Sequence, residues 1–126
     1  MLRASRAALR PGGRLAFHTI EPGPGLSAAD RRRAFKAGPP AVAVRTNHPS
    51  LLRSAGFVEI DATDVTAEYT ATQRRWQEAT VRHEAELREA LGDENVDDGL
   101  ERRRSTLAAL NEGLLARTLY TGRRPS

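Results

Sequence analysis

The strongest constraint on the fold is the turn Pro11-Gly12-Gly13, because it joins two segments of different hydrophobic period. Before the turn, Leu2 and Leu9 are spaced for one face of a helix that ends near residue 10. Proline presets the first φ of a turn, and glycine supplies the positive φ that follows. Residues 14–20 (RLAFHTI) then alternate and favour β-structure. We therefore expect a helix that leads through a tight turn directly into a strand.

Capping residues predict two short helices after this strand. Ser27, with Asp30 three residues later, is typical of a helix N-terminus, and Gly38 is expected to end that helix. Pro49 near a helix start and Gly56 just beyond its end predict a further helix of two turns.

Two more strands are predicted. Residues 57–66 (FVEIDATDVT) alternate between apolar and polar side chains, so Val58, Ile60 and Ala62 are expected on one face. Residues 114–124 (LLARTLYTGRR) have the aliphatic and aromatic content of a closing strand. Three strands, two of them set after helices, suggest part of an α/β sheet.

A helical pair is predicted between these two strands, at about residues 67–112. The first helix runs from Thr70 to Leu91, with Thr70 and Gln73 as its capping box and Gly92 at its end. The second helix starts near Asn95. The first helix carries one stripe at steps of three and four residues, formed by Gln73, Trp76, Thr80, His83, Leu87 and Leu91. The stripe of the second helix is Val96, Leu100, Leu107 and Leu110.

The composition is that of one soluble globular domain of 126 residues, with 39% hydrophobic and 29% charged residues. No apolar run approaches the roughly 20 residues of a membrane span, and the first ten residues lack the pattern of a signal peptide. Because the chain has no cysteine, thiolate metal sites are excluded and a cytoplasmic location is expected.

The net charge of +4 raises nucleic acid as a partner, but the arrangement of the charge argues against it. Lys36 is the only lysine, and most arginines are interleaved with glutamates. Only Arg31-Arg32-Arg33 and Arg102-Arg103-Arg104 are dense, and each is expected on a solvated helix face. We expect no nucleic-acid partner.

Three segments in order resemble the class I S-adenosylmethionine-dependent methyltransferases. In that family a helix ends in a Leu-x-Pro-Gly-Gly turn before the fifth strand, as residues 9–13 do here. A helix ending in Ala-Gly-Phe precedes the sixth strand, as residues 55–57 do, and a last, antiparallel strand closes the sheet, as residues 113–124 would. The resemblance spans residues 2–122 and implies the last three strands of a Rossmann-like methyltransferase sheet, with the helical pair inserted.

The same resemblance implies that residues 1–126 are the C-terminal half of such a domain. The family binds its cofactor in the first half, so the resemblance implies S-adenosylmethionine in the complete domain and no activity of this half alone. It also implies a small-molecule methyl acceptor, and inserted helices in related enzymes often cover the substrate site.

Two groups of residues are candidates to face the acceptor. His18, Thr19 and Glu21 lie at the carboxyl end of the first predicted strand, where ligands gather in open α/β sheets. An alternative for His18 is a histidine hydrogen-bonded to a loop carbonyl. The three histidines of the chain lack the spacing of metal ligands, so no metal site is predicted.

The second group lies on the long helix, where Tyr69, Trp76 and His83 are seven residues apart on one face. These side chains could form an aromatic lid with a general base. The alternative is a stripe that only packs against the sheet.

The loop Glu21-Pro22-Gly23-Pro24-Gly25 permits a third interpretation, in which Glu21, Gly23 and Gly25 bind a nucleotide or S-adenosylmethionine. Pro22 and Pro24 have no N–H to donate, which argues against it. The alternative is a proline-glycine surface loop.

A non-enzymatic function is also open: a remnant or interaction module in which the helical pair binds a partner. An unpaired edge on the first strand would favour aggregation. A second chain or self-association is therefore expected to cover that edge.

Overall fold

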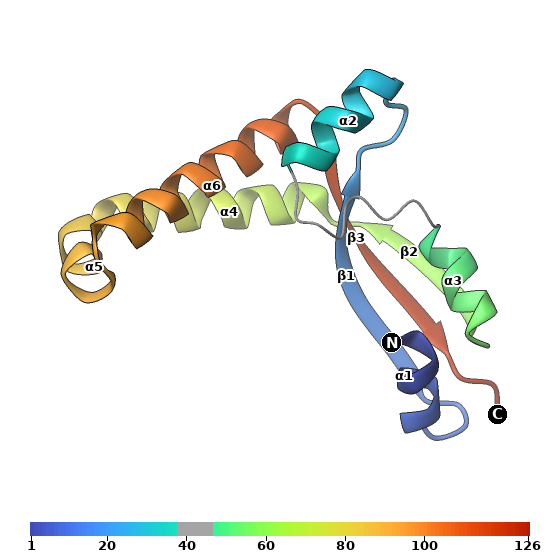
Figure 1. Cartoon of the computed structure of the whole chain (residues 1–126). Helices are drawn as coiled ribbons and strands as arrows, with labels where there is room; N and C mark the ends of the chain where they lie inside the picture. The colour runs from blue at the N-terminus through green and yellow to red at the C-terminus, as the bar shows by residue number, and fades with distance from the viewer. Residues whose placement is uncertain (38–46) are drawn as a thin grey trace.

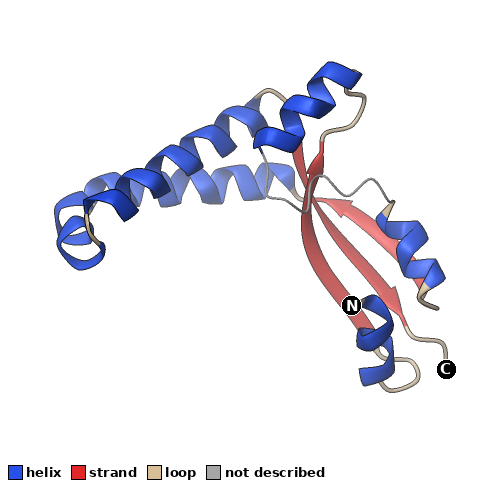
Figure 2. Cartoon of the chain, viewed as in Figure 1, coloured by secondary structure: helices blue, strands red, loops and turns tan. Residues whose placement is uncertain are grey.

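The computed structural model describes residues 1–37 and 47–126, and it combines three strands with six helices over those residues (Figures 1 and 2). In chain order the elements are α1 (Leu2–Ala8), β1 (Arg14–Pro22), α2 (Ala28–Ala37), α3 (His48–Ser54), β2 (Val58–Asp64), α4 (Thr66–Arg82), α5 (Glu84–Leu91), α6 (Asp93–Asn111) and β3 (Leu115–Arg123). The order helix, strand, two helices, strand, helices, strand is the predicted one.

The three strands form one sheet in the order β1-β3-β2. β3 is antiparallel to both neighbours, so β1 and β2 run in the same direction. The last strand is antiparallel as predicted, and it lies between the other two. Because directly paired residues share a face, His18 lies on the face of Leu119, and Phe17 lies on the opposite face with Tyr120.

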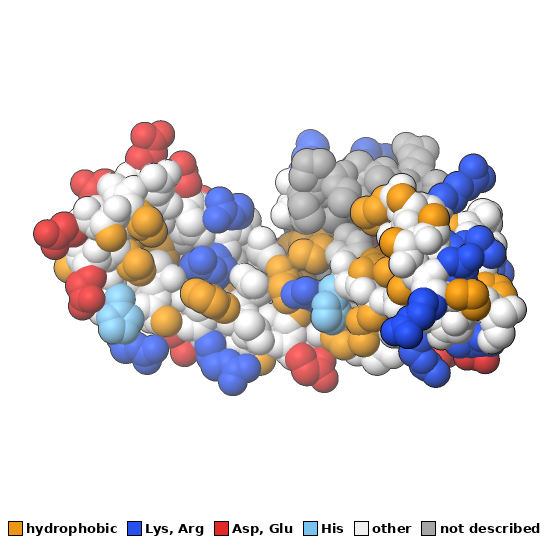
Figure 3. All heavy atoms as spheres, turned by 90° about the horizontal axis from the view of Figure 1, so that it is seen from below, with side chains coloured by type: hydrophobic (Ala, Val, Ile, Leu, Met, Phe, Trp, Pro, Cys, Tyr) orange, Lys and Arg blue, Asp and Glu red, His pale blue; other side chains and the backbone are white. Residues whose placement is uncertain are grey.

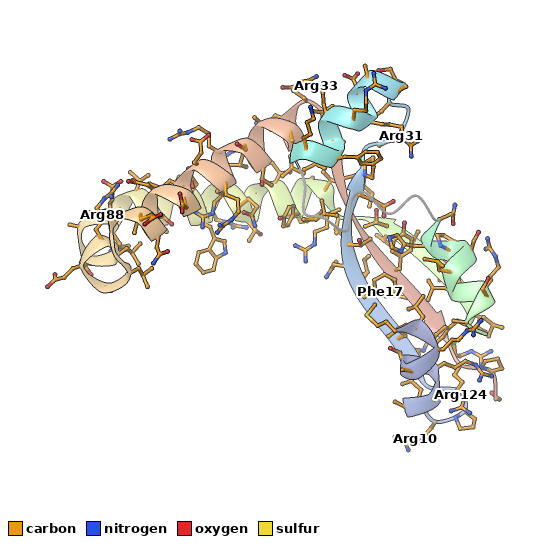
Figure 4. The ribbon with its side chains drawn as sticks, viewed as in Figure 1. Arg10, Phe17, Arg31, Arg33, Arg88 and Arg124 are labelled. Carbon is orange, nitrogen blue, oxygen red and sulfur yellow. The ribbon has the colours of Figure 1, made fainter. Side chains whose placement is uncertain are left out.

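Helices α1 and α3 cover the Phe17 face of the sheet (Figures 1 and 4). The buried centre of this layer is Leu52, Phe57 and Tyr120, with Leu52 fully enclosed. The Pro11-Gly12-Gly13 turn forms as predicted, with Gly12 at φ 79° and the Gly13 N–H bonded to the Arg10 carbonyl at 2.8 Å. It returns the chain from α1 onto the sheet.

Helices α4, α5 and α6 form a helical arm that projects away from the sheet (Figure 1). α4 and α6 lie side by side, and α5 is at the far end. At the base of the arm, α2 packs against α6, and the Arg33 guanidinium contacts the Glu112 carboxylate at 2.7 Å (Figure 4). A second apolar cluster holds this base together, formed by Ala34, Ala109, Leu110, Leu114 and Leu115.

The predicted helix from Thr70 to Leu91 is wrong in two respects. α4 begins at Thr66, so Thr70 lies inside the helix and its hydroxyl donates to the Thr66 carbonyl at 2.7 Å instead of capping. At His83 the backbone leaves the helical region (φ −106°, ψ 22°), which divides the predicted helix into α4 and α5. The predicted pair is therefore three helices, and Trp76, His83 and Leu91 of the predicted packing stripe are exposed.

The predicted face of the second strand is also corrected. Val58 pairs with Arg123 and Asp61 with Thr121, so β2 contains one extra residue between these pairs. Such a bulge moves Val58 to the face of Asp61, away from Ile60 and Ala62. Glu59 lies in the bulge at φ 50° and accepts hydrogen bonds from the Arg123 guanidinium at 2.9 and 3.1 Å.

Three of the predicted helix-end signals are confirmed within the described residues. The Ser27 hydroxyl accepts from the Asp30 N–H at 3.1 Å, Gly56 follows α3 at φ 92°, and Gly92 ends α5 at φ 89°. The predicted stop at Gly38 lies outside the described residues. α6 begins at Asp93, two residues before the predicted start at Asn95.

Candidate functional site

A hollow of about 450 Å³ lies where the base of the helical arm meets the sheet. We call it the arm-base hollow. Its walls come from β1, the β2–α4 junction, α4 and β3, elements that are far apart in the sequence. It is lined by His18, Val65, Glu68, Tyr69, Thr72, Gln73, Trp76 and Arg117.

Three of the six predicted acceptor-facing residues meet in this hollow: His18, Tyr69 and Trp76. β1 continues to Pro22, so His18 lies in the middle of the strand and not at its end. Its imidazole makes no hydrogen bond to the other described residues, so the alternative of a bond to a loop carbonyl is not seen there. Trp76 is 60% exposed, an unusual position for a large aromatic side chain that serves only packing.

Arg117 was not predicted, and it is the cation of the hollow. Its guanidinium carbon lies 4.5 Å from the centroid of the Tyr69 ring, a cation–π arrangement. The sequence alone gave no signal for it, because only the β1–β3 register, which pairs Arg117 with Ile20, brings it to the His18 face.

A hydrogen-bonded clip fixes the backbone beneath this cation. The Thr66 hydroxyl accepts from the Arg117 N–H at 3.0 Å, and the Val65 N–H donates to the Arg117 carbonyl at 2.9 Å. Asp64 accepts from both the N–H and the hydroxyl of Thr66, at 2.9 Å from the nitrogen. These two bonds stabilise the charged carboxylate and lower the pKa of Asp64 below its ordinary value.

The other three candidates lie elsewhere. Thr19 faces a separate hollow beside β1 and α3, which it shares with Phe17 and His48. His83 is at the far end of the arm, where its side chain is 59% exposed and lies 3.7 Å from Glu86. Acidic side chains gather at this end of the arm (Figure 3).

Glu21 is occupied by a contact within the sheet. Its carboxylate accepts a hydrogen bond from the Tyr120 hydroxyl at 2.7 Å. Burial, followed by this contact with a carboxylate, raises the pKa of Tyr120. The pair therefore links β1 and β3 on the face of the sheet opposite His18.

Gly23 of the Glu21–Gly25 loop is engaged in a backbone contact with the segment before β3. The Gly23 N–H donates to the Leu114 carbonyl at 2.8 Å, and a Cβ at Gly23 would lie 1.9 Å from the Gly113 carbonyl oxygen. Gly23 therefore permits close approach of two backbone segments, and its N–H is not available to a phosphate or carboxylate. With Glu21 bound to Tyr120 as well, two of the three residues of the nucleotide-loop interpretation have partners within the sheet.

The arm is braced by polar contacts close to the hollow. Arg103 on α6 donates to the Gln77 side-chain oxygen at 2.9 Å and to the Thr80 hydroxyl at 3.3 Å. At the far end, Arg88 reaches Glu84, Asp93 and Asp97, at 3.4, 3.2 and 2.7 Å (Figure 4). The Arg103 contacts hold α4, which forms a wall of the hollow, against α6, and the Arg88 contacts hold α5 against α6.

The arrangement can bind a small polar molecule and supply a proton acceptor. Arg117 offers a guanidinium for an anion, and Gln73 offers an amide. Trp76 and Tyr69 offer aromatic surface, and a neutral His18 imidazole can accept a proton.

The described residues contain no group of three histidine or acidic side chains that could hold a metal ion. Among the same residues, no helix is both long enough and apolar enough to cross a membrane.

Comparison with known proteins establishes the fold. No protein-family model and no curated protein matches the sequence. Solved structures do match. One is phosphoethanolamine N-methyltransferase 2 of Haemonchus contortus, in complex with phosphomonomethylethanolamine and S-adenosylhomocysteine. The match has a TM-score of 0.80 at 14% identity and covers 99% of this chain and 29% of that one. The cyclopropane synthase MmaA2 of Mycobacterium tuberculosis also matches (TM-score 0.76, 17% identity, 98% and 48%). So does the [4+2]-cyclase SpnF (TM-score 0.70, 18% identity, 98% and 43%).

This chain thus spans less than half the length of these three proteins. It has the fold of part of the S-adenosylmethionine-dependent methyltransferases, as the resemblance implied. At 11–18% identity the likeness is one of fold.

Proposed function

We propose that this chain is the acceptor-binding, C-terminal portion of an S-adenosylmethionine-dependent methyltransferase whose acceptor is a small molecule. The observation that carries the proposal is the arm-base hollow, in which His18, Tyr69, Trp76 and Arg117 converge at the junction of the sheet and the inserted helices. Its volume of about 450 Å³ is in the range of small-molecule sites.

Each side chain has a role in this proposal. Trp76 and Tyr69 enclose the body of the acceptor, while His18 accepts the proton that an acceptor nitrogen or oxygen must lose. Methyl transfer depends mainly on holding two reactants in line, so the positioning supplied by the rigid arm would be the chief contribution of this chain.

S-adenosylmethionine belongs to the proposal for the complete domain only. The Glu21–Gly25 loop does not fit it, because Gly23 and Glu21 are both engaged within the sheet. We therefore propose that a second part of the domain supplies the cofactor site. A cytoplasmic location is proposed with it, from the lack of cysteine.

The test uses the protein isolated from its own cells through an affinity tag, together with the 126-residue chain. Each preparation is incubated with methyl-labelled S-adenosylmethionine and the small-molecule extract of the same cells, and labelled products are detected by mass spectrometry. We expect a labelled product with the cellular protein and none with the 126-residue chain. His18→Ala should lower the rate of product formation by about 100-fold or more, as expected for the loss of a general base.

Thr19→Ala is the matched control, because Thr19 neighbours His18 on β1 but does not line the arm-base hollow, whereas His18 borders both hollows. Its rate should stay close to that of the unmodified protein. If the cellular protein methylates nothing in the extract and binds neither S-adenosylmethionine nor S-adenosylhomocysteine in calorimetry, the methyltransferase proposal is wrong.

The second candidate function is a non-enzymatic interaction module. β1 is an edge strand of the described sheet, and a free edge can pair with another strand. A second chain or another copy of this chain would then cover the edge. A monomer of the 126-residue chain in light scattering, at concentrations where it stays folded, would count against this alternative.

A further inference from the structure

Arg117 is a positioned cation that faces a hollow without a charged partner. Within residues 1–37 and 47–126, its guanidinium forms no ion pair and donates no hydrogen bond. The side chain is half-buried, and its charge lies over the Tyr69 ring at 4.5 Å. Because the guanidinium donates to none of the other described residues, its N–H groups remain available to a ligand.

The position of this cation is set before any ligand arrives. Thr66 and Val65 hold the backbone of Arg117 from both its N–H and its carbonyl, and Asp64 holds Thr66. The Tyr69 ring then restricts the side chain. A donor that is already fixed loses little conformational freedom on binding, which favours ligand recognition over a merely solvated surface charge.

The neighbouring groups favour a negatively charged ligand of small size. Glu68 is the one acidic side chain among the lining residues, and it forms no ion pair with Arg117. His18 and Gln73 add hydrogen-bonding groups, and Trp76 adds an apolar wall.

We propose that the arm-base hollow binds acceptors that carry an oxyanion group, a carboxylate or a phosphate, and that Arg117 recognises this group. The inference rests on the proposed function in that it names the class of acceptor. A planar guanidinium matches carboxylate and phosphate oxygens with two parallel hydrogen bonds, and the apolar body of the acceptor then lies against Trp76.

The experiment exploits the fact that Trp76 is the only tryptophan in the chain, so its fluorescence reports on the surroundings of this one side chain, which borders the arm-base hollow and the neighbouring hollow that Arg75 lines. The 126-residue chain is titrated at constant ionic strength with propionate, propyl phosphate, propanol and propylammonium. We expect saturable changes in emission with one or both anions, and none with propanol or propylammonium at the same concentrations. The ratio of the two anion affinities then distinguishes a carboxylate from a phosphate ligand.

Three variants separate charge, geometry and location. Arg117→Gln should weaken anion binding at least tenfold, and Arg117→Lys should restore part of it because it keeps the charge but not the planar fork. Arg75→Gln is the matched control, since Arg75 lies beside Trp76 but lines a different hollow, and it should change the affinity less than twofold. Circular dichroism confirms that each variant is folded, and Arg117→Lys carries the test if Arg117→Gln does not fold.

Binding of propanol as tight as that of the anions, or an equal loss in Arg75→Gln and Arg117→Gln, would overturn this inference. An unchanged affinity of Arg117→Gln for the anions would also overturn it. The two proposals fail separately. Anion binding without methyl transfer by the cellular protein would refute the methyltransferase proposal alone. A methylated product that lacks any oxyanion group would refute the Arg117 inference alone.

Discussion

Gly23→Ala is the substitution that most directly tests the structural role of Gly23 in the Glu21–Gly25 loop. Gly23 is buried at the end of β1, and its Cβ would lie 1.9 Å from the Gly113 carbonyl oxygen. Real Cβ contacts essentially never fall below 3.0 Å, so one of the two backbone segments must move by about 1.1 Å. That movement separates Gly23 from Leu114, whose carbonyl accepts its N–H at 2.8 Å.

The cost follows from these two effects. Forcing extra volume into a packed site costs about 1–3 kcal/mol, and a lost backbone hydrogen bond costs about 0.5–1.5 kcal/mol. We expect Gly23→Ala to lower the free energy of unfolding by about 2–4 kcal/mol. In urea, with a slope of about 2 kcal/mol per molar, the unfolding midpoint followed by circular dichroism would fall by about 1–2 M.

Gly25→Ala is the matched control in the same loop. A Cβ at Gly25 meets no atom within 4 Å, although the residue has φ +72°. Only the strain of a left-handed alanine remains, about 1–2 kcal/mol, so its urea midpoint should fall less than that of Gly23→Ala. If Gly23→Ala keeps the unmodified midpoint within about 0.3 M while Gly25→Ala loses more, the structural role of Gly23 is refuted.

Three further substitutions test the packing of Leu52, the hydrogen-bonded clip at Asp64 and the contact of Arg124 with α1. Leu52→Ala should lower the free energy of unfolding by about 2–5 kcal/mol in urea titrations, because Leu52 is fully buried between α3 and the sheet. Hydrogen bonds from Thr66 lower the pKa of Asp64 in the folded state. The Asp64 carboxylate therefore contributes its full stabilisation above the unfolded-state pKa, near 4, and this stabilisation is lost as the pH falls through the folded-state pKa. Asp64→Asn should therefore flatten the loss of urea resistance between about pH 5 and pH 3, and an unchanged acid slope would contradict this. The Arg124 guanidinium donates to the carbonyls of Arg6 and Leu9, so Arg124→Gln should speed amide hydrogen exchange throughout α1. Faster exchange that is confined to residues 124–126 would refute this contact.

The parts of the fold that could be predicted are those fixed by short-range chemistry. The Gly12 turn, the Ser27 cap and the stop at Gly92 each depend on φ preferences or on a hydrogen bond within three residues. The break at His83 could not be predicted from the stripe, because the same three- and four-residue spacing continues through it. The bulge at Glu59 coincides with hydrogen bonds from the Arg123 guanidinium, 64 residues away in the chain, a contact that a local pattern does not reveal.

The residues of the candidate site likewise include some that the sequence could predict and some that it could not. His18 was singled out because ligands gather at the carboxyl ends of strands in an α/β sheet, although it lies in the middle of β1, and Trp76 and Tyr69 because they share a helical period. Arg117 could not, since 20 residues of the chain are lysine or arginine and only the sheet register selects this one. Glu21 was selected by its place at the strand end and in a glycine loop, but its carboxylate accepts a hydrogen bond from Tyr120, 99 residues away in the chain.

The reaction of a chain with this fold has to be argued from side chains, because the fold is shared by an N-methyltransferase, a cyclopropane synthase and a [4+2]-cyclase. The elements that form the arm-base hollow all belong to this chain: β1, β3, α4 and the β2–α4 junction. The loop that resembles a cofactor site is instead used to pack β1 against the start of β3. The proposed recognition of an anion therefore concerns residues of this chain only, so it can be measured on the 126-residue chain without a cofactor.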